Sequence, residues 1–339
     1  MDTEQIGTTD DGNVVERCTL VGGGLTMNLL SWGCVVQDLR LESFEKPLVL
    51  GFEKFDYYPE HSRFFGSTAG RYANRIANGR FVLDGNEYQC DQNFLGKHCL
   101  HGGSNSLGVR NWKFTEITGD SAVLEIIDPD GEMGFPGKCE IKATFSLREG
   151  GRLHIRYEAV CDAPTLVNLA HHSYFNLAGE GDIQNHEMEI EADYFLEVDE
   201  EAIPLGEPSP VEDTEFDFRK MRRIGMTKNG ELVRYDHNFC AAGERRALTQ
   251  IARVRSNSSN VEMVVSSTEP GVQFYDANKL ETPVPGLIGK PYGSRAGFCL
   301  EPQIWPDSPN RSYYPQAVLR PGEQYVQETE YRFGMAADE

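Results

Sequence analysis

A strict two-residue alternation of apolar and polar side chains constrains the fold of this chain more than any other feature. The apolar positions are Cys139, Ile141, Ala143, Phe145 and Leu147, followed after a Gly-Gly turn by Leu153, Ile155, Tyr157 and Ala159. Successive side chains of a strand point to opposite faces, so the pattern predicts two antiparallel strands with one buried face. We expect a hairpin whose five-residue loop spans residues 148–152.

The alternation recurs along the chain, at residues 188–194 and 261–265, and in a tight hairpin that turns through Asp84-Gly85. Helical periodicity is scarce and predicts only short helices, over residues 55–61 and 217–223. The sequence does not alternate strands with helical stretches, as a chain that forms a parallel sheet would. These patterns predict an all-β fold, a large antiparallel β-sandwich with few short helices.

Neither a composition shift nor a Pro-rich or Ser-rich linker interrupts the sequence, so we expect one domain over residues 1–339.

The formal net charge of −21 would repel a nucleic acid or an anionic membrane surface. The longest apolar stretches, such as residues 47–52, are too short to span a bilayer. Eight scattered cysteines suggest reduced thiols. We therefore expect a cytoplasmic protein with no nucleic acid or membrane partner.

Two polar, glycine-containing segments interrupt the strand pattern and are candidates for binding. In the first, residues 70–79, two arginines stand four residues apart; each could bind a ligand oxygen or pair with a structural acid. The second contains His98 and His101. Their spacing resembles that of zinc ligands, but the following Gly-Gly opposes the helix that would align the rings. Two interpretations of this segment remain: a histidine bonded to the backbone, or a histidine that donates to a ligand.

Adjacent histidines occur in the segment 167–179, which reads as a buried strand. By the two-residue period they must point to opposite faces, and His172 shares the face of Asn168 and Ala170. One histidine of such a pair is commonly a core residue that bonds to backbone.

Two acidic residues in aromatic surroundings complete the set of candidates. Burial of Glu301 between Leu300 and Pro302 would raise its pKa toward the range of a general base. Trp305 offers a flat face for the apolar side of a sugar ring. The structural alternatives are a turn-capping role for Asp236 and a surface strand position for Glu301.

Taken together, six segments resemble, in order and approximate spacing, the motifs of the aldose 1-epimerase, or galactose mutarotase, family. They are GRYANRIANG (residues 70–79), LHGG (100–103), NLAHHSYFNLAG (168–179), DHNF (236–239), GVQFY (271–275) and GFCLEPQIWPD (297–307). The resemblance extends from about residue 31 to residue 323. It implies that the chain interconverts the α and β anomers of free aldohexoses such as galactose and glucose.

The resemblance also implies the family's β-sandwich, no metal or organic cofactor, and a monomer or weak homodimer. It places Glu301 at the position of the catalytic base and His172 at that of the catalytic acid. The positions that hold the sugar in the family correspond to Asn74, Arg75, His101, Asp236 and Gln273. Position 171 is often Asn in the family, so His171 is a departure that could shift the pKa of His172.

The chemistry of ring opening suits these residue types. A base takes the proton of the anomeric hydroxyl while an acid protonates the ring oxygen, so we expect an ionised Glu301 beside a protonated His172 near neutral pH. One alternative is a hexose-phosphate epimerase that uses Arg71, Arg75 and Arg80. The others are a glycosidase that pairs Asp236 with Glu301, and a non-catalytic sugar-binding protein on the same fold.

Overall fold

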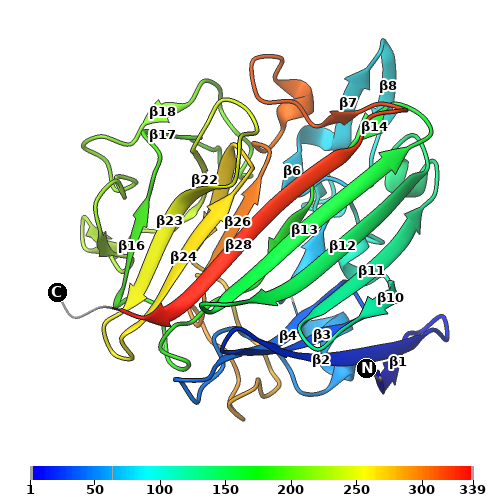
Figure 1. Ribbon diagram of the computed structural model, residues 1–339. Coiled ribbons are helices and arrows are strands. Elements are labelled where there is room, and N and C mark those ends of the chain that lie inside the picture. Colours follow the sequence, from blue (N-terminus) through cyan, green and yellow to red (C-terminus); the bar gives the residue numbers. More distant parts are fainter. Residues whose placement is uncertain (1–2, 63, 337–339) are drawn as a thin grey trace.

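Antiparallel strands dominate the structure, a computed structural model that describes residues 3–62 and 64–336. The largest sheet has nine strands (Figure 1). In spatial order they are β10 (Lys113–Ile117), β11 (Ser121–Asp128), β12 (Cys139–Arg148), β13 (Arg152–Cys161), β28 (Tyr325–Met335), β24 (Val261–Ser267), β23 (Thr249–Ser256), β16 (His186–Ile190) and β19 (Arg222–Arg223). β28 lies in the middle, where it joins the β10–β13 half to the half that begins with β24.

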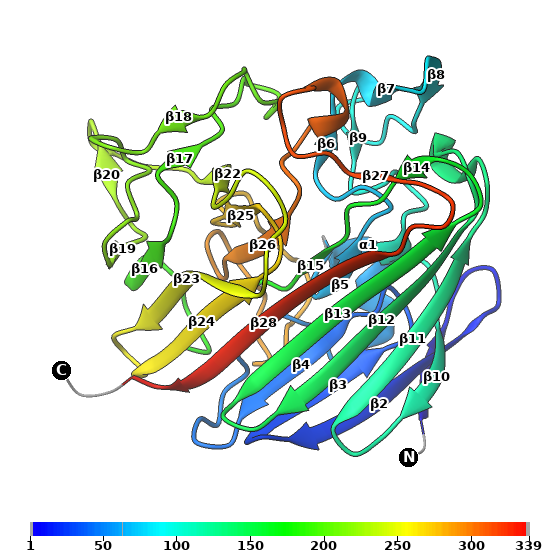
Figure 2. The same cartoon turned by 45° about the horizontal axis from the view of Figure 1, so that its top comes forward.

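Two smaller sheets pack against the large one (Figure 2). One has four strands: β1 (Glu4–Thr8), β2 (Val14–Gly22), β3 (Leu25–Leu30) and β4 (Val36–Leu41). The other has five, in the order β18 (Ser209–Pro210), β17 (Tyr194–Phe195), β22 (Asp236–Cys240), β25 (Gly271–Tyr275) and β26 (Cys299–Gln303). Apolar side chains from all three sheets form one buried cluster. This arrangement confirms the predicted β-sandwich.

The strands β12 and β13 pair without interruption from Cys139 opposite Cys161 to Arg148 opposite Arg152. The loop between them is therefore three residues long, not the five that we predicted. Gly150 and Gly151 have φ angles of +80° and +70°, which let the chain reverse within this short span. The predicted face is correct, because Phe145 is fully buried.

Helices are few and short, as expected. The prediction over residues 55–61 is confirmed by the 3₁₀ helix η1 (Phe55–Tyr57) and by α1 (Tyr58–His61). The helix predicted over residues 217–223 is wrong. There the Asp217 side chain accepts the backbone N–H of Arg219 and turns the chain, and the next residues become strand β19 on β16. The other 3₁₀ helices are η2 (Ala77–Gly79), η3 (Leu107–Val109), η4 (Glu132–Gly134) and η5 (Ser308–Asn310).

Several two-stranded pairs complete the secondary structure. They are β15 (Ala170–His172) with β5 (Ser67–Ala69), β6 (Arg75–Ile76) with β9 (Cys99–Leu100), β7 (Arg80–Leu83) with β8 (Asn86–Gln89), β14 (Thr165–Leu166) with β27 (Val318–Leu319), and β20 (Thr227–Lys228) with β21 (Glu231–Leu232). β15 also lies against β26 of the five-stranded sheet. This contact brings His172 next to Glu301.

All eight cysteines are free thiols, as the sequence suggested. In the part of the chain that the structure describes, no helix combines the length and apolar character needed to cross a membrane. The expectation of a single domain stays a prediction.

We predict that Phe145→Ala lowers the free energy of unfolding by about 3–5 kcal/mol, because it leaves a cavity under the large sheet. Lys142→Ala, a control on the outer face of the same strand, should change it by less than about 0.5 kcal/mol. Urea unfolding followed by circular dichroism measures both. Equal effects of the two substitutions would contradict the assignment of the faces.

Candidate active site

Three neighbouring strands of the five-stranded sheet present a row of polar side chains. The register places Asn238 of β22 opposite Gln273 of β25, and Gln273 opposite Glu301 of β26. Asp236 lies two residues before Asn238 and therefore points to the same face. Asn238, Gln273 and Glu301 are all buried. The face thus combines burial with acid and amide groups.

His172 joins this row from β15. Its Nε2 atom lies 3.6 Å from Oε2 of Glu301, and its Nδ1 atom lies 3.6 Å from Sγ of Cys299. Both members of the imidazole–carboxyl pair are almost fully buried, with 4% of His172 and 2% of Glu301 exposed. A proton can pass between these groups after small movements, directly or through a bound hydroxyl.

His171 points to the opposite side of the strand, as the alternation predicted. Its Nε2 atom lies 2.7 Å from Oγ of Ser173, and its ring packs edge-on against Phe145 and Tyr331. Burial lowers the pKa of His171 to about 3. His171 is therefore an uncharged core residue and adds no charge beside His172.

The segments around residues 74 and 101 supply the remaining predicted residues. Arg75 donates from Nη2 to Oδ2 of Asp236 at 3.1 Å, and Gln273 donates from Nε2 to Oδ1 of the same carboxylate at 2.7 Å. Asn74 accepts the backbone N–H of Arg75 at its Oδ1, and its own backbone N–H donates to Nδ1 of His101. The structure therefore brings all seven predicted site residues together.

Three other candidates lie apart from the site. Arg71 is fully buried, where it pairs with Asp128 at 2.7 Å and donates to backbone carbonyl groups. Arg80 pairs with Glu87 at the surface. Of the three arginines, Arg75 is the one in contact with the other site residues. His98, the other member of the zinc-like pair, instead contacts Glu201 through Nε2 at 3.1 Å.

Three aromatic side chains border the site, and the sequence did not reveal them. The ring of Phe64 lies 4.8 Å from that of His101 and 5.7 Å from that of His172. Tyr174 stacks on His172 at 5.2 Å, and Phe94 lies under the guanidinium of Arg75 at 4.7 Å. Tyr174 follows His172 by two residues, so the alternation could have identified it. Phe64 and Phe94 lie outside the regular strands, where no periodicity marks them.

Among the seven predicted site residues, three buried polar atoms have no hydrogen bond: Oε2 of Glu301, Oε1 of Gln273 and Nε of Arg75. Buried polar groups are normally paired, and each unpaired one costs about 1–3 kcal/mol. Two of these atoms are acceptors of the kind that binds hydroxyl groups, and the third is a charged donor. A ligand with several hydroxyl groups matches this set.

Burial raises the pKa of Glu301 well above its ordinary value, and the nearby Asp236 carboxylate adds to the shift. Burial likewise lowers the pKa of His172 to about 4 and the pKa of His101 well below its ordinary value. Each shift favours the uncharged form. Loss of hydration thus works against the expected pairing of an ionised Glu301 with a protonated His172 in the sugar-free protein.

The site also holds a possible metal-binding group. Within residues 3–62 and 64–336, one set of potential ligands lies close enough to share an ion: the ligand atoms of His101, His172 and Glu301, all within 4.8 Å of one another. Two imidazoles and a carboxylate are common transition-metal ligands. An ion bound there would occupy the lone pairs that proton transfer between Glu301 and His172 requires.

An imidazole and a carboxyl group 3.6 Å apart, among unpaired hydrogen-bonding groups on a β-sandwich, are typical of an acid–base enzyme that acts on small polyhydroxylated substrates. The model of the aldose 1-epimerase family matches residues 16–332, and the chain belongs to this family. It is accordingly an isomerase that interconverts the anomers of aldoses.

Individual relatives cover nearly the whole chain. The galactose mutarotase of Rattus norvegicus is 39% identical over 331 residues, which cover 96% of each chain. The aldose 1-epimerase of Escherichia coli (strain K12) is 34% identical and covers 95% of this chain and 96% of its own. Among solved structures, an aldose epimerase homologue from C. elegans has a TM-score of 0.88 and 31% identity, covering 95% of this chain and 100% of its own. Galactose 1-epimerase from Lactobacillus acidophilus has a TM-score of 0.83 and 25% identity, with 99% of each chain covered.

The two pKa shifts predict opposite pH dependences of stability. Because the pKa of Glu301 is raised on folding, the folded state keeps this proton at pH values at which the unfolded state has lost it. Glu301 therefore lowers the free energy of unfolding as the pH rises above about 4.5. A lowered pKa means that the unfolded state gains a proton first, so His172 costs stability as the pH falls from 6.5 towards 4. The melting temperature of Glu301→Gln relative to wild type should therefore increase with pH above 4.5. That of His172→Asn should increase as the pH falls below 6.5. Differences independent of pH in thermal scans would contradict these directions.

Proposed function

We propose that this chain interconverts the α and β anomers of free aldohexoses such as galactose and glucose, with Glu301 as the base and His172 as the acid. The observation that supports these roles is the 3.6 Å separation of His172 Nε2 from Glu301 Oε2 in a buried polar site. Full-length relatives named galactose mutarotase and aldose 1-epimerase support the substrate class.

In the proposed reaction, Glu301 removes the proton of the anomeric hydroxyl while His172 delivers a proton to the ring oxygen. The bond from C1 to the ring oxygen breaks and leaves an open-chain aldehyde. Rotation about C1–C2 presents the other face of the carbonyl group, and reclosure returns both protons with the roles reversed. Each correctly placed group typically contributes ~10²–10⁴ in rate.

The uncharged pair of the sugar-free protein supplies the same proton that this mechanism needs. A protonated Glu301 with a neutral His172 and an ionised Glu301 with a protonated His172 contain equal numbers of protons, so they differ only in the position of one proton. Sugar hydroxyls that donate to the Glu301 carboxylate stabilise its charge. Binding therefore shifts the proton towards His172, where it is available to the ring oxygen.

The remaining residues hold the sugar in this proposal. His101 accepts the Asn74 backbone N–H at Nδ1, so its proton is on Nε2, which can donate to a sugar oxygen. Asp236 is held from two sides by Arg75 and Gln273 and presents an oriented carboxylate to hydroxyl groups. Together these side chains fix the ring relative to the acid–base pair.

Specific contacts disfavour the two catalytic alternatives. A phosphate group would require several cations around it, but Arg71 is committed to Asp128 and Arg80 to Glu87. A glycosidase pair would require Asp236 to exchange a proton or attack the sugar. Its oxygens instead bind Arg75 and Gln273.

The remaining sequence-based expectations are part of the proposal. The enzyme acts without a metal or organic cofactor, in the cytoplasm, as a monomer or weak homodimer. The eight free thiols support a reducing compartment.

We predict that Glu301→Gln lowers kcat for mutarotation of α-D-galactose by about two to four orders of magnitude, because the amide cannot accept the proton. His172→Asn should have a comparable effect. The combined effect should be smaller than the product of the two, since both groups serve one transfer. Polarimetry of freshly dissolved sugar, with protein pretreated with a chelator, measures these rates.

Glu269→Gln is a matched control, since Glu269 is also a buried carboxylate but pairs with Arg245. It should leave kcat within about threefold of wild type. Full activity of a folded Glu301→Gln variant would reject the proposed base. Activity lost on chelation and restored by a divalent ion would reject the metal-free mechanism.

Asp236→Ala should chiefly raise KM, because it removes a carboxylate that binds sugar and orients Arg75 and Gln273. We expect an increase of roughly tenfold or more, with a smaller fall in kcat. Initial rates over a range of galactose concentrations separate the two parameters. Unchanged kinetics would remove Asp236 from the sugar site.

A further inference from the structure

The position of Arg75 depends on more than its side-chain contacts. The guanidinium is held by Asp236, by Oδ1 of Asn74 at 3.4 Å and by the ring of Phe94. Its backbone, however, belongs to β6, a strand of two residues that pairs only with the equally short β9 in the described structure. So short a ladder fixes its residues weakly, and other contacts must hold this segment in place.

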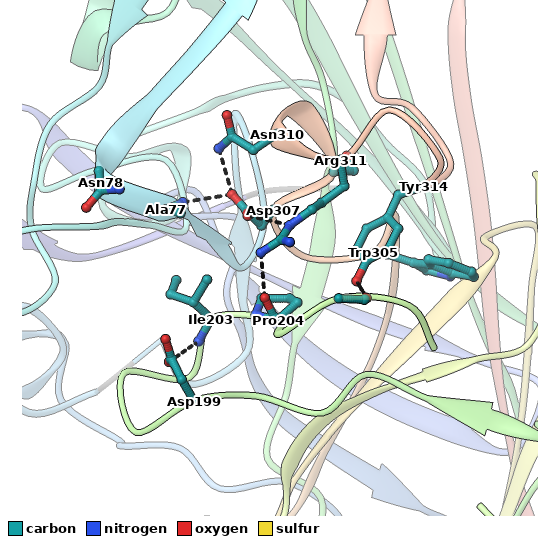
Figure 3. Close-up of polar contacts among 12 residues, drawn as sticks. Ala77, Asn78, Asp199, Ile203, Pro204, Trp305, Asp307, Asn310, Arg311 and Tyr314 are labelled. Carbon is teal, nitrogen blue, oxygen red and sulfur yellow. Dashed lines mark hydrogen bonds and ion pairs between the residues drawn. The ribbon is translucent and has the colours of Figure 1, made fainter. Parts of the chain in front are cut away.

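Asp307 supplies two of those contacts. Its backbone N–H donates to the carbonyl oxygen of Arg75 at 2.9 Å. Its Oδ1 atom accepts the backbone N–H of Ala77 at 2.9 Å, as Figure 3 shows. One residue thus holds both ends of the segment from Arg75 to Ala77. Asp307 follows β26, the strand of Glu301, after a short connection. It therefore joins the strand with the proposed base to the segment with Arg75.

Asp307 is itself firmly held. Only 1% of its surface is exposed. Oδ1 also accepts from Nδ2 of Asn310 at 2.7 Å, and Oδ2 pairs with Nε of Arg311 at 3.2 Å (Figure 3). A carboxylate with this many partners has one orientation, so the N–H of Ala77 meets a fixed acceptor.

The contacts continue into the loop of residues 199–206. Arg311 donates from Nη2 to the carbonyl oxygen of Pro204 at 2.6 Å, and the hydroxyl of Tyr314 bonds to the carbonyl of Gly206 (Figure 3). Asp199 holds the loop in shape by accepting the N–H of Ile203. The loop is thereby attached to the segment after β26.

The same loop returns to the Arg75 segment on its other side. Glu201 contacts Nε2 of His98 at 3.1 Å, and Nδ1 of His98 accepts the backbone N–H of Asn78 at 2.9 Å. Asn78 is the residue next to Ala77. Polar contacts and short stretches of chain thus form a closed ring, which runs from Asp307 through the backbone of Ala77 and Asn78 to His98 and returns through the loop of residues 199–206 and Arg311.

We propose that Asp307 is a positioning residue for the sugar site, which fixes the guanidinium of Arg75 by holding the backbone from Arg75 to Ala77. The inference rests on the proposed role of Arg75 in sugar binding. Asp307 itself contacts no reacting atom in this proposal. Its loss should therefore affect sugar affinity more than the chemical step.

The test compares KM and kcat for galactose mutarotation in four proteins: wild type, Asp307→Ala, Arg75→Ala and the double variant. Asp307→Ala should raise KM roughly tenfold and change kcat by less. In the Arg75→Ala background the same substitution should have little further effect on KM, because the group that it positions is already gone. Equal effects of Asp307→Ala in both backgrounds would overturn the proposal, as would a KM within twofold of wild type.

A matched control variant separates an effect on positioning from an effect on stability. Glu269→Ala also removes a buried carboxylate paired with one arginine, but its partner Arg245 lies outside the site. It should lower the melting temperature without raising KM. An equal increase in KM for Glu269→Ala would show that destabilisation alone explains the effect and would overturn the proposal.

The conservative variant Asp307→Asn keeps an oxygen that can accept from Ala77, so its KM should lie closer to wild type than that of Asp307→Ala. This variant and Glu269→Gln keep the experiment decisive if the alanine variants do not fold. In that case the comparison is between Asp307→Asn and Glu269→Gln. Asp307→Asn loses the ion pair with Arg311 and should therefore have the higher KM, so identical KM values would overturn the proposal. An inactive wild type, or Arg75→Ala with normal KM, would instead refute the proposed function or the role of Arg75.

Discussion

The cross-strand register of β22, β25 and β26 is the constraint on which the site depends. Phe239, Val272 and Leu300 are buried in the core shared with the large sheet, and this burial fixes which face of each strand points the other way. A slip of one residue on β25 or β26 would exchange Gln273 or Glu301 for an apolar side chain. The relative position of Gln273 and Glu301 is therefore determined by packing on the far side of the same sheet.

That packing also determines the electrostatics of the site. Because the polar row is buried, loss of hydration acts on every ionisable group in it, and both Glu301 and His172 favour their uncharged forms. Asp236 differs in having the positive charge of Arg75 at 3.1 Å. The Glu301–His172 pair and the Arg75–Asp236 ion pair therefore lie in one site but in different electrostatic surroundings.

The sequence was sufficient for those parts of the structure that repeat or form motifs. Alternation identified the strands around Phe145 and the opposite orientations of His171 and His172, and the motifs pointed to seven residues that the structure brings together. Local interactions were harder to foresee: the Asp217 side chain turns a segment that we expected to be helical. Phe64 and Phe94 reach the site from irregular segments, and the charge states depend on three-dimensional burial, which no linear pattern contains.

The central place of β28 has a consequence for how the chain is made. Its two neighbours, β13 and β24, are both synthesised before it, and in the nine-stranded sheet they meet only through it. During translation the early half-sheet therefore has an unpaired edge at β13 until β28 leaves the ribosome. Sheets that depend on such distant pairings form slowly, and open edges expose the nascent chain to association with other chains. The large sheet can therefore close only once β28 has been made, and until then the edge at β13 is accessible to chaperones.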